Sequence, residues 1–248
     1  MASLQLVVRI ARAAPGAPHS ARGATDMEPL GPIHWETITP HMRDMLRFIG
    51  KQSFAERFYL AGGTSLALRL GHRRSIDLDF FSATDEVPRK TRQEILSALS
   101  PLNPEALEDV DGNLLLRVSG LHAGFFSYGY ALLESAESVE GVSVASVLDV
   151  GLMKLDALIT RGSRKDFYDV YVIAQQKPIS DLLALTKRKY PYARDFELMV
   201  VESLVLFENA DRDYQPEILI DLPWEKVRQF FIAEAQALGQ IWFGDHEK

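Results

Sequence analysis

The chain contains no cysteine and no long apolar run. Without cysteine among its 248 residues, it can form no disulfide, no thiolate nucleophile and no cysteine-based zinc site. No apolar stretch approaches the roughly 18 residues that a membrane-spanning helix needs, so we expect no membrane partner. A reducing compartment such as the cytoplasm fits this composition.

Positive charge is also scarce. The formal net charge is -7, so a broad basic face for nucleic acid is not expected. Hydrophobic residues make up 47% of the chain, and the length corresponds to one large domain or two small ones. Any contact with RNA would be local. The candidates for such a contact are Arg73, Arg74, Arg161, Arg164, Lys165 and the basic run 187–189.

Residues 1–26 differ in character from the remainder of the chain. They carry three arginines and no acid before Asp26, among Ala, Gly and Pro. This composition is compatible with a basic, transit-like helix, but we favour a disordered extension ahead of a start near Met27. We therefore predict a mixed α/β core at 27–143 and a helical part at 144–248 packed on that core.

The periodicity of apolar residues predicts an α+β fold. Strands are predicted at 58–61, 76–81, 113–118 and 124–133, and Gly120 predicts a hairpin between the last two. Helices are predicted at 39–52, 64–70 and from Pro88 to the proline at 101. Beyond Ser143 only helices are predicted, at 146–160, 164–175, 179–189, 195–209 and 223–241.

Two aspartates stand out in the predicted strand 76–81. Asp77 and Asp79 are two residues apart, so their side chains point to the same face. Two like charges on neighbouring positions repel each other, and a divalent cation removes that penalty. Oxygen-only ligands with open positions suit magnesium or manganese. The alternative is the solvated end of an edge strand.

A glycine turn precedes this strand. Gly62 and Gly63 permit backbone conformations closed to other residues, and Thr64 and Ser65 can cap a helix or bind a phosphate. Free backbone N–H groups at the start of a helix attract phosphates. An ordinary strand-to-helix turn is the alternative. Because the turn and the acids lie on consecutive strands, we expect a phosphate site beside the metal ligands.

Basic residues and further acids form a second group. Arg73 can bind phosphate oxygens, or it can balance the aspartates that come after it. Lys154 and Arg161 are seven residues apart and share a helix face, and Asp166 and Asp169 share a face of the next helix. Ion pairs between two packed helices would explain this second group equally well.

Two blocks of residues match a known pattern in order and spacing. The first block reads Gly62-Gly63-Thr64-Ser65, then His72-Arg73-x-Ser75-x-Asp77-x-Asp79-x-Phe81. The second block reads Lys154-x-x-Ala157-Leu158-x-x-Arg161-x-x-x-Lys165-Asp166-x-x-Asp169. Both blocks resemble the motifs of the AbiEii/AbiGii-type nucleotidyltransferase toxin family.

The resemblance implies a polymerase-β-like nucleotidyltransferase core with a helical part after it. It implies that Gly62 to Ser65 hold the triphosphate, that Asp77 and Asp79 ligate magnesium (or manganese), that Lys154 approaches a phosphate and that Asp166 lies near the nucleotide. Members act as toxins, and some transfer nucleotides to RNA. We therefore predict transfer of an NMP from an NTP to a hydroxyl of an RNA, such as a tRNA, or of a protein, with a cognate antitoxin as partner.

One departure concerns a third carboxylate. Polymerase-β-like enzymes usually carry it on a neighbouring strand, but the segment from Gly124 to Tyr130 contains no acid. Ser127 or Tyr128 is the candidate for that place. Asp109 and Asp111 are expected in a loop upstream of this segment, and Glu134 lies just beyond it.

Two other hypotheses remain open. The missing acid is compatible with a module that binds nucleotide or protein without turnover. The helical part could also dock an antitoxin through aromatic anchors, although packing in the core is the simpler explanation for most of them. These aromatic residues are Trp224, Phe230, Phe231, Trp242 and Phe243.

Overall fold

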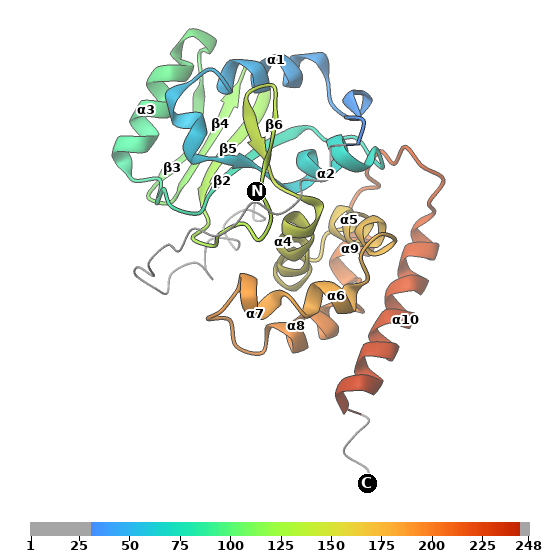
Figure 1. Ribbon diagram of the computed structural model, residues 1–248. Coiled ribbons are helices and arrows are strands. Elements are labelled where there is room, and N and C mark those ends of the chain that lie inside the picture. Colours follow the sequence, from blue (N-terminus) through green and yellow to red (C-terminus); the bar gives the residue numbers. More distant parts are fainter. Residues whose placement is uncertain (1–30, 244–248) are drawn as a thin grey trace.

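The computed structural model describes residues 31–243, and the extension at 1–26 lies outside this range. Within it the chain forms a seven-stranded mixed sheet with helices on both faces (Figure 1). The strands lie in the order β3-β4-β5-β2-β1-β7-β6. Their bounds are β1 Tyr59–Leu60, β2 Asp77–Ser82, β3 Glu105–Val110, β4 Asn113–Val118, β5 Leu121–Ser127, β6 Glu137–Val139 and β7 Val142–Val144.

The helices divide into an early and a late group. The early helices are α1 Pro40–Ile49, α2 Gly62–Leu70 and α3 Arg89–Leu99, with 3-10 turns at Trp35–Thr37, Ser53–Arg57 and Ser100–Leu102. The late helices are α4 Val147–Thr160, α5 Arg164–Ala174, α6 Ile179–Leu183, α7 Thr186–Lys189, α8 Phe196–Ser203, α9 Glu208–Arg212 and α10 Trp224–Phe243. The predicted α+β architecture is confirmed. No helix of residues 31–243 has both the length and the apolar character required to cross a bilayer.

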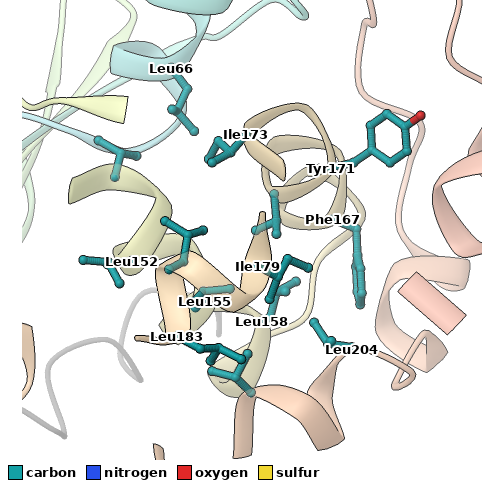
Figure 2. Packing of buried hydrophobic residues seen from close by; sticks show 14 of the residues in the cluster. Leu66, Leu152, Leu155, Leu158, Phe167, Tyr171, Ile173, Ile179, Leu183 and Leu204 are labelled. Atoms are coloured by element: carbon teal, nitrogen blue, oxygen red, sulfur yellow. The ribbon is translucent and has the colours of Figure 1, made fainter. Parts of the chain in front are cut away.

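Two hydrophobic clusters lie on the two faces of the sheet, because alternate residues of a strand point to opposite sides. Leu78 and Phe80 of β2 pack with α1 and α3 on one face. Phe81, next along the same strand, packs with α4 and α5 on the other. On that second face, Leu66 of α2 belongs to the same cluster as Leu152 and the other buried leucines of α4 (Figure 2). The helical part therefore covers the sheet face to which Asp77 and Asp79 also belong.

Local sequence signals explain several of these elements. The Thr39 hydroxyl accepts a hydrogen bond from the Met42 N–H at 3.2 Å and caps α1, with Pro40 at the first helical position. Strands β4 and β5 pair antiparallel around Ser119 and Gly120, both at positive φ. The predicted helix start and the predicted hairpin are both confirmed.

Other boundaries differ from the predictions. The strand predicted at 124–133 begins at Leu121 and ends at Ser127. Asp109, expected in a loop, lies in β3, and Asp111 comes next in the turn to β4. β3 exposes most of its residues on both sides, so it lacks the alternation that marks a half-buried strand. β6 and β7 have only three residues each, and the helices predicted at 179–189 and 195–209 each divide in two.

Candidate active site

The two aspartates of β2 point away from the core of α1 and α3. Burial of Leu78 and Phe80 on that side fixes the register, so Asp77 and Asp79 share the opposite face. β2 pairs in parallel with β5, which places Asp77 opposite His122 and Asp79 opposite Gly124. The Asp77 side chain is 36% exposed, and the His122 Nδ1 lies 3.3 Å from its Oδ1. This end of the strand reaches solvent.

Asp79 is the more enclosed of the two carboxylates. Burial and the charge of Asp77 raise its pKa, whereas the charges of Lys165, Arg161 and Lys154 oppose the rise. Within residues 31–243, no basic side chain lies within ion-pair distance of Asp79. The pair is therefore a concentration of negative charge with incomplete compensation from the protein.

The glycine turn lies directly against this pair. Gly62 has a φ of +64°, and a side chain at this position would bring a Cβ to 3.1 Å from the Asp79 Oδ2. Glycine is required here both for the left-handed backbone and for the close approach. Strands β1 and β2 pair antiparallel, so the turn after β1 returns to the acids of β2. The structure brings the turn and the two carboxylates together.

The hydroxyls of Thr64 and Ser65 have partners inside the protein. Both side chains are buried. The Thr64 hydroxyl lies within hydrogen-bond distance of the Asp77 carbonyl and the Ser75 hydroxyl, and the Ser65 hydroxyl donates to the Ala145 carbonyl at 3.1 Å. These bonds hold α2 against β2 and the start of α4. The first-turn backbone N–H groups of α2 can still donate to a phosphate, because the start of a helix leaves them without intrahelical acceptors.

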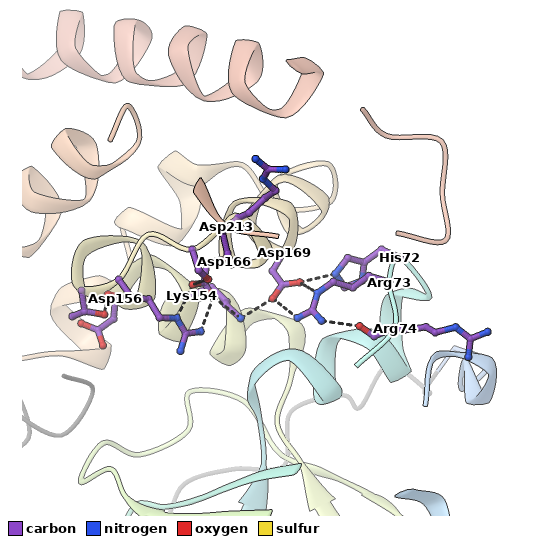
Figure 3. A network of polar contacts seen from close by, with 12 residues as sticks. His72, Arg73, Arg74, Lys154, Asp156, Asp166, Asp169 and Asp213 are labelled. Atoms are coloured by element: carbon purple, nitrogen blue, oxygen red, sulfur yellow. Dashed lines mark hydrogen bonds and ion pairs between the residues drawn. The ribbon is translucent and has the colours of Figure 1, made fainter. Parts of the chain in front are cut away.

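The second group of residues forms a buried charge network (Figure 3). Asp169 accepts from His72 Nε2 at 2.7 Å and from Arg73 Nε and Nη2 at 2.7 and 2.9 Å, and its Oδ2 lies 2.6 Å from Lys154 Nζ. Asp166 accepts from Lys154 at 2.8 Å and from Arg161 through two nitrogens at 2.7 Å each. Lys154 thus bridges the two aspartates.

Both aspartates of this network are fully enclosed and charged. Burial alone would raise the pKa of each, but the surrounding cations outweigh it. Arg161 and Lys154 hold the pKa of Asp166 well below its usual range, and Arg73 and Lys154 do the same for Asp169. These pairs tie the loop before β2 to the helical part.

Arg73 also explains the second glycine of the turn. A side chain at position 63 would overlap the Arg73 guanidinium and would touch the Ser75 hydroxyl. The guanidinium is buried, bound to Asp169, and donates to the Arg74 carbonyl at 2.9 Å. Three of its five N–H donors are bound within the protein, so its predicted contact with phosphate stays a prediction.

A family model described as "Nucleotidyl transferase AbiEii toxin, Type IV TA system" matches residues 43–115 and 131–238, more than half of the chain. The chain belongs to the AbiEii nucleotidyltransferase toxin family. It is therefore an enzyme of the nucleotidyltransferase type, and the family resemblance predicted from the two motif blocks is confirmed.

The chain is also similar to one curated protein and to several solved structures. An uncharacterised protein of Aquifex aeolicus (strain VF5) is 34% identical over 199 residues, which cover 78% of this chain and 94% of that protein. JHP933 from Helicobacter pylori is a solved structure with 17% identity and a TM-score of 0.46, covering 81% of this chain and 89% of that one. The structure of ANT(2")-Ia in complex with adenylyl-2"-tobramycin has 14% identity and a TM-score of 0.45, covering 62% and 99%.

In this AbiEii-family chain, the strand beside the acid pair contributes no third carboxylate. The positions of β5 that face Asp77 and Asp79 are His122 and Gly124. Ser127 pairs with Ser82 at the far end of the strand, and Tyr128 lies beyond it, so neither lies beside the acids in register. Asp109 and Asp111 are ion-paired with Arg92. Neither Ser127 nor Tyr128, the two sequence-based candidates for this position, therefore occupies it.

Two residues of the site were not among the predicted site residues of this family member. His122 was missed because the predicted strand began two residues after it. Lys165 was noted as a basic residue but not as part of the site, although it lies four residues before Asp169 and hence on the same face of α5. That spacing was the available signal for Lys165.

Proposed function

We propose that this protein transfers a nucleoside monophosphate from an NTP to a hydroxyl group of an RNA, such as a tRNA, or of a protein, and that it does so as the toxin of a toxin–antitoxin or phage-defence system. The observation that carries the proposal is the approach of the Gly62 turn to Asp79. It joins a helix start, which suits phosphates, to a carboxylate pair, which suits cations.

The chemistry is an in-line displacement. The acceptor oxygen bonds to the α-phosphorus while the bond from that phosphorus to the oxygen bridging to the β-phosphate breaks. Pyrophosphate leaves with that electron pair, and the hydroxyl proton is lost to water. In this chain, the first-turn N–H groups of α2 at Gly62, Gly63 and Thr64 would bind the phosphates, with the positive end of the helix dipole behind them.

The carboxylates fit a hard divalent cation. Asp77 and Asp79 offer oxygen donors on one face, and the raised pKa of Asp79 marks charge that the protein leaves partly uncompensated. Residues 31–243 contain no cluster of three or more His, Cys, Asp and Glu side chains able to hold a metal on their own. Magnesium is commonly bound by one or two carboxylates together with substrate phosphates. A bound cation would stabilise the attacking and leaving oxygens.

Lys154 and Asp166, which the resemblance places near the nucleotide, would act as positioning residues. Each is buried and bound to the other at 2.8 Å, so neither has to contact substrate to matter. Their network holds α5 over the sheet face that carries the aspartates. Loss of either would displace the helical wall of the site.

The test is label transfer from each radiolabelled NTP to total RNA and to total protein in the presence of magnesium. Asp77→Asn combined with Asp79→Asn should lower transfer by about 10³-fold or more. The matched control is Asp109→Asn with Asp111→Asn, a second Asp-x-Asp pair whose partner is Arg92. Equal transfer by the wild type and the Asp77/Asp79 double variant would refute the proposal.

A module that binds without turnover is the second candidate, favoured by the absence of an acid at His122 and Gly124. It predicts that NTP raises the melting temperature while no acceptor yields pyrophosphate. In that case the Asp77/Asp79 double variant would lose the NTP-induced rise in melting temperature, and neither it nor the wild type would transfer a nucleotide.

A further inference from the structure

Four cations surround the two aspartate pairs, and three of them are engaged. Arg73 is bound to Asp169, Arg161 to Asp166, and Lys154 to both. The fourth is Lys165, on the first turn of α5. Among residues 31–243, its ammonium group has no hydrogen-bond or ion-pair partner. Of the four, it is the one that has no carboxylate partner within the described residues.

The geometry of α5 sets the direction of this side chain. Lys165 and Asp169 are four residues apart, so they lie on the same face of the helix. Asp169 is fixed to His72 and Arg73, and the Arg73 guanidinium lies over Gly63 and beside Ser75. The face of α5 that carries Lys165 is therefore held over the start of α2 and the start of β2.

The pKa shifts of Asp79 and Lys165 also indicate that Lys165 lies near the pair Asp77 and Asp79. The charge of Lys165 is the largest of the three cationic influences that lower the pKa of Asp79. Conversely, burial and the charges of Arg161 and Lys154 lower the pKa of Lys165, while Asp166 and Asp77 oppose this shift. Lys165 therefore interacts with Asp77 and Asp79 through its charge but forms an ion pair with neither. This places its ammonium group at the edge of the space between the two aspartates and the glycine turn.

We propose that Lys165 is a side chain that binds the polyphosphate of the nucleotide, in addition to the first-turn N–H groups of α2, and holds the pyrophosphate as it leaves. This assignment rests on the proposed nucleotidyl transfer and adds a substrate contact within that site. A half-buried lysine without an ion-pair partner destabilises the folded chain when the cost of burying its charge exceeds the attraction of nearby acids, as the lowered pKa of Lys165 indicates. An anion of high charge supplies the missing compensation.

The experiment measures binding of tripolyphosphate by isothermal titration calorimetry, with the same magnesium concentration in every arm. Lys165→Met should weaken binding roughly tenfold or more, the effect of losing a charge-assisted hydrogen bond. Lys165→Arg, which keeps the charge, should recover at least part of that affinity. The control is Lys177→Met, a half-buried lysine just beyond the other end of α5. It should bind as the wild type does.

Thermal unfolding separates this role from a structural one. Lys165→Met should keep or raise the melting temperature, because it removes a charge for which burial and neighbouring cations outweigh the attraction of the aspartates. A lower melting temperature with wild-type affinity for tripolyphosphate would overturn the proposal and make Lys165 a counter-charge for the aspartates. Equal affinities of the Lys165→Met and Lys177→Met proteins would overturn it as well.

The two proposals fail in different ways. If the wild type transfers no nucleotide to any acceptor but Lys165→Met still loses tripolyphosphate, the polyphosphate-binding role of Lys165 stands, whereas its role toward pyrophosphate falls with the enzymatic proposal. If transfer by Lys165→Met proceeds with the wild-type KM for NTP, the assignment of Lys165 falls and the enzymatic proposal stands.

Discussion

Two pairs of aspartates lie close together in this protein and are treated in opposite ways. Asp166 and Asp169 are fully buried and held by three cationic side chains, with a histidine and a serine as further donors, and their pKa values are lowered. Asp77 and Asp79 have only His122 within ion-pair distance among the described residues, and the pKa of Asp79 is raised. The first pair is compensated by the protein itself, and the second is not.

This difference separates support from chemistry. A fully compensated carboxylate offers no free lone pair or charge to a ligand, so the Asp166 and Asp169 pair fixes elements in place. An uncompensated pair destabilises the fold and is kept where a ligand completes it. Motif matching alone ranks the four aspartates equally, whereas their partners distinguish them.

The largest expected effect comes from breaking the compensated pair. Asp169→Asn leaves Arg73, His72 and Lys154 with a neutral partner in a buried site, so the free energy of unfolding should fall by about 3–5 kcal/mol. Urea unfolding at pH 7.5 measures it. Because the folded pKa of Asp169 is lowered, its stabilisation exists above the unfolded pKa of about 4 and is lost in acid, so the deficit should shrink below that pH.

A control lies next to this pair. Glu217 forms an ion pair with Arg74 at 2.6 Å, but both side chains are exposed. Glu217→Gln should change the free energy of unfolding by less than about 1 kcal/mol. Similar losses in Asp169→Asn and Glu217→Gln would remove the distinction between compensated and exposed pairs.

A smaller effect, of opposite sign, is expected at Asp156 of α4. This carboxyl is 8% exposed, its Oδ1 has no hydrogen-bond partner among the described residues, and burial raises its pKa to about 6 against the opposing charge of Arg161. Its folded pKa exceeds the unfolded value of about 4, so stability is lost as pH rises from roughly 4 to 6. Asp156→Asn should therefore raise the free energy of unfolding by roughly 2–3 kcal/mol at pH 7.5.

The contrast for this variant is Asp149, seven residues earlier on the same face of α4. Asp149 is bound to Lys189 at 2.7 Å and accepts from the Leu133 and Glu134 N–H groups. Asp149→Asn should lower the free energy of unfolding at pH 7.5, because Lys189 would lose its buried counter-charge. A stability gain from Asp156→Asn that persists unchanged at pH 4 would contradict the assigned cause.

The smallest effect is expected at Asp79 itself. Removing its charge relieves repulsion with Asp77, so Asp79→Asn should raise the free energy of unfolding slightly, by less than about 1 kcal/mol. Because the folded pKa is raised, this gain belongs to pH values above the unfolded pKa and vanishes in acid. A clear loss of stability at neutral pH would place Asp79 with the structural aspartates and would end the comparison.

Much of the fold could be read from local signals. The capped helix α1, the strand β4 and its turn to β5 are specified by patterns within about ten residues. Strand β3 was not predicted from the sequence, because this edge strand lacks the alternation of buried and exposed residues. Its residues Glu105, Leu107 and Val110 are all exposed. The two short strands β6 and β7 carry too few residues for any period to show.

The site was predictable in its residue types but not in its pairings. Asp77, Asp79 and the glycine turn are near neighbours in sequence, and the strand periods placed them together. Arg73 and Asp169 are 96 residues apart, so no local pattern could reveal that the arginine is bound to a buried aspartate. For the same reason the sequence could not show that Lys165, among several basic residues, lacks a partner within the described range.

The link from Arg73 to Asp169 also bears on how ligands come and go. A hinge motion that moved α5 away from the sheet would separate Asp169 from its buried partners, an arginine, a histidine and a lysine. The loss of these buried ion pairs makes such a motion energetically unfavourable. For the proposed site, this leaves the sheet edge where Asp77 and His122 reach solvent as the route for nucleotide and product.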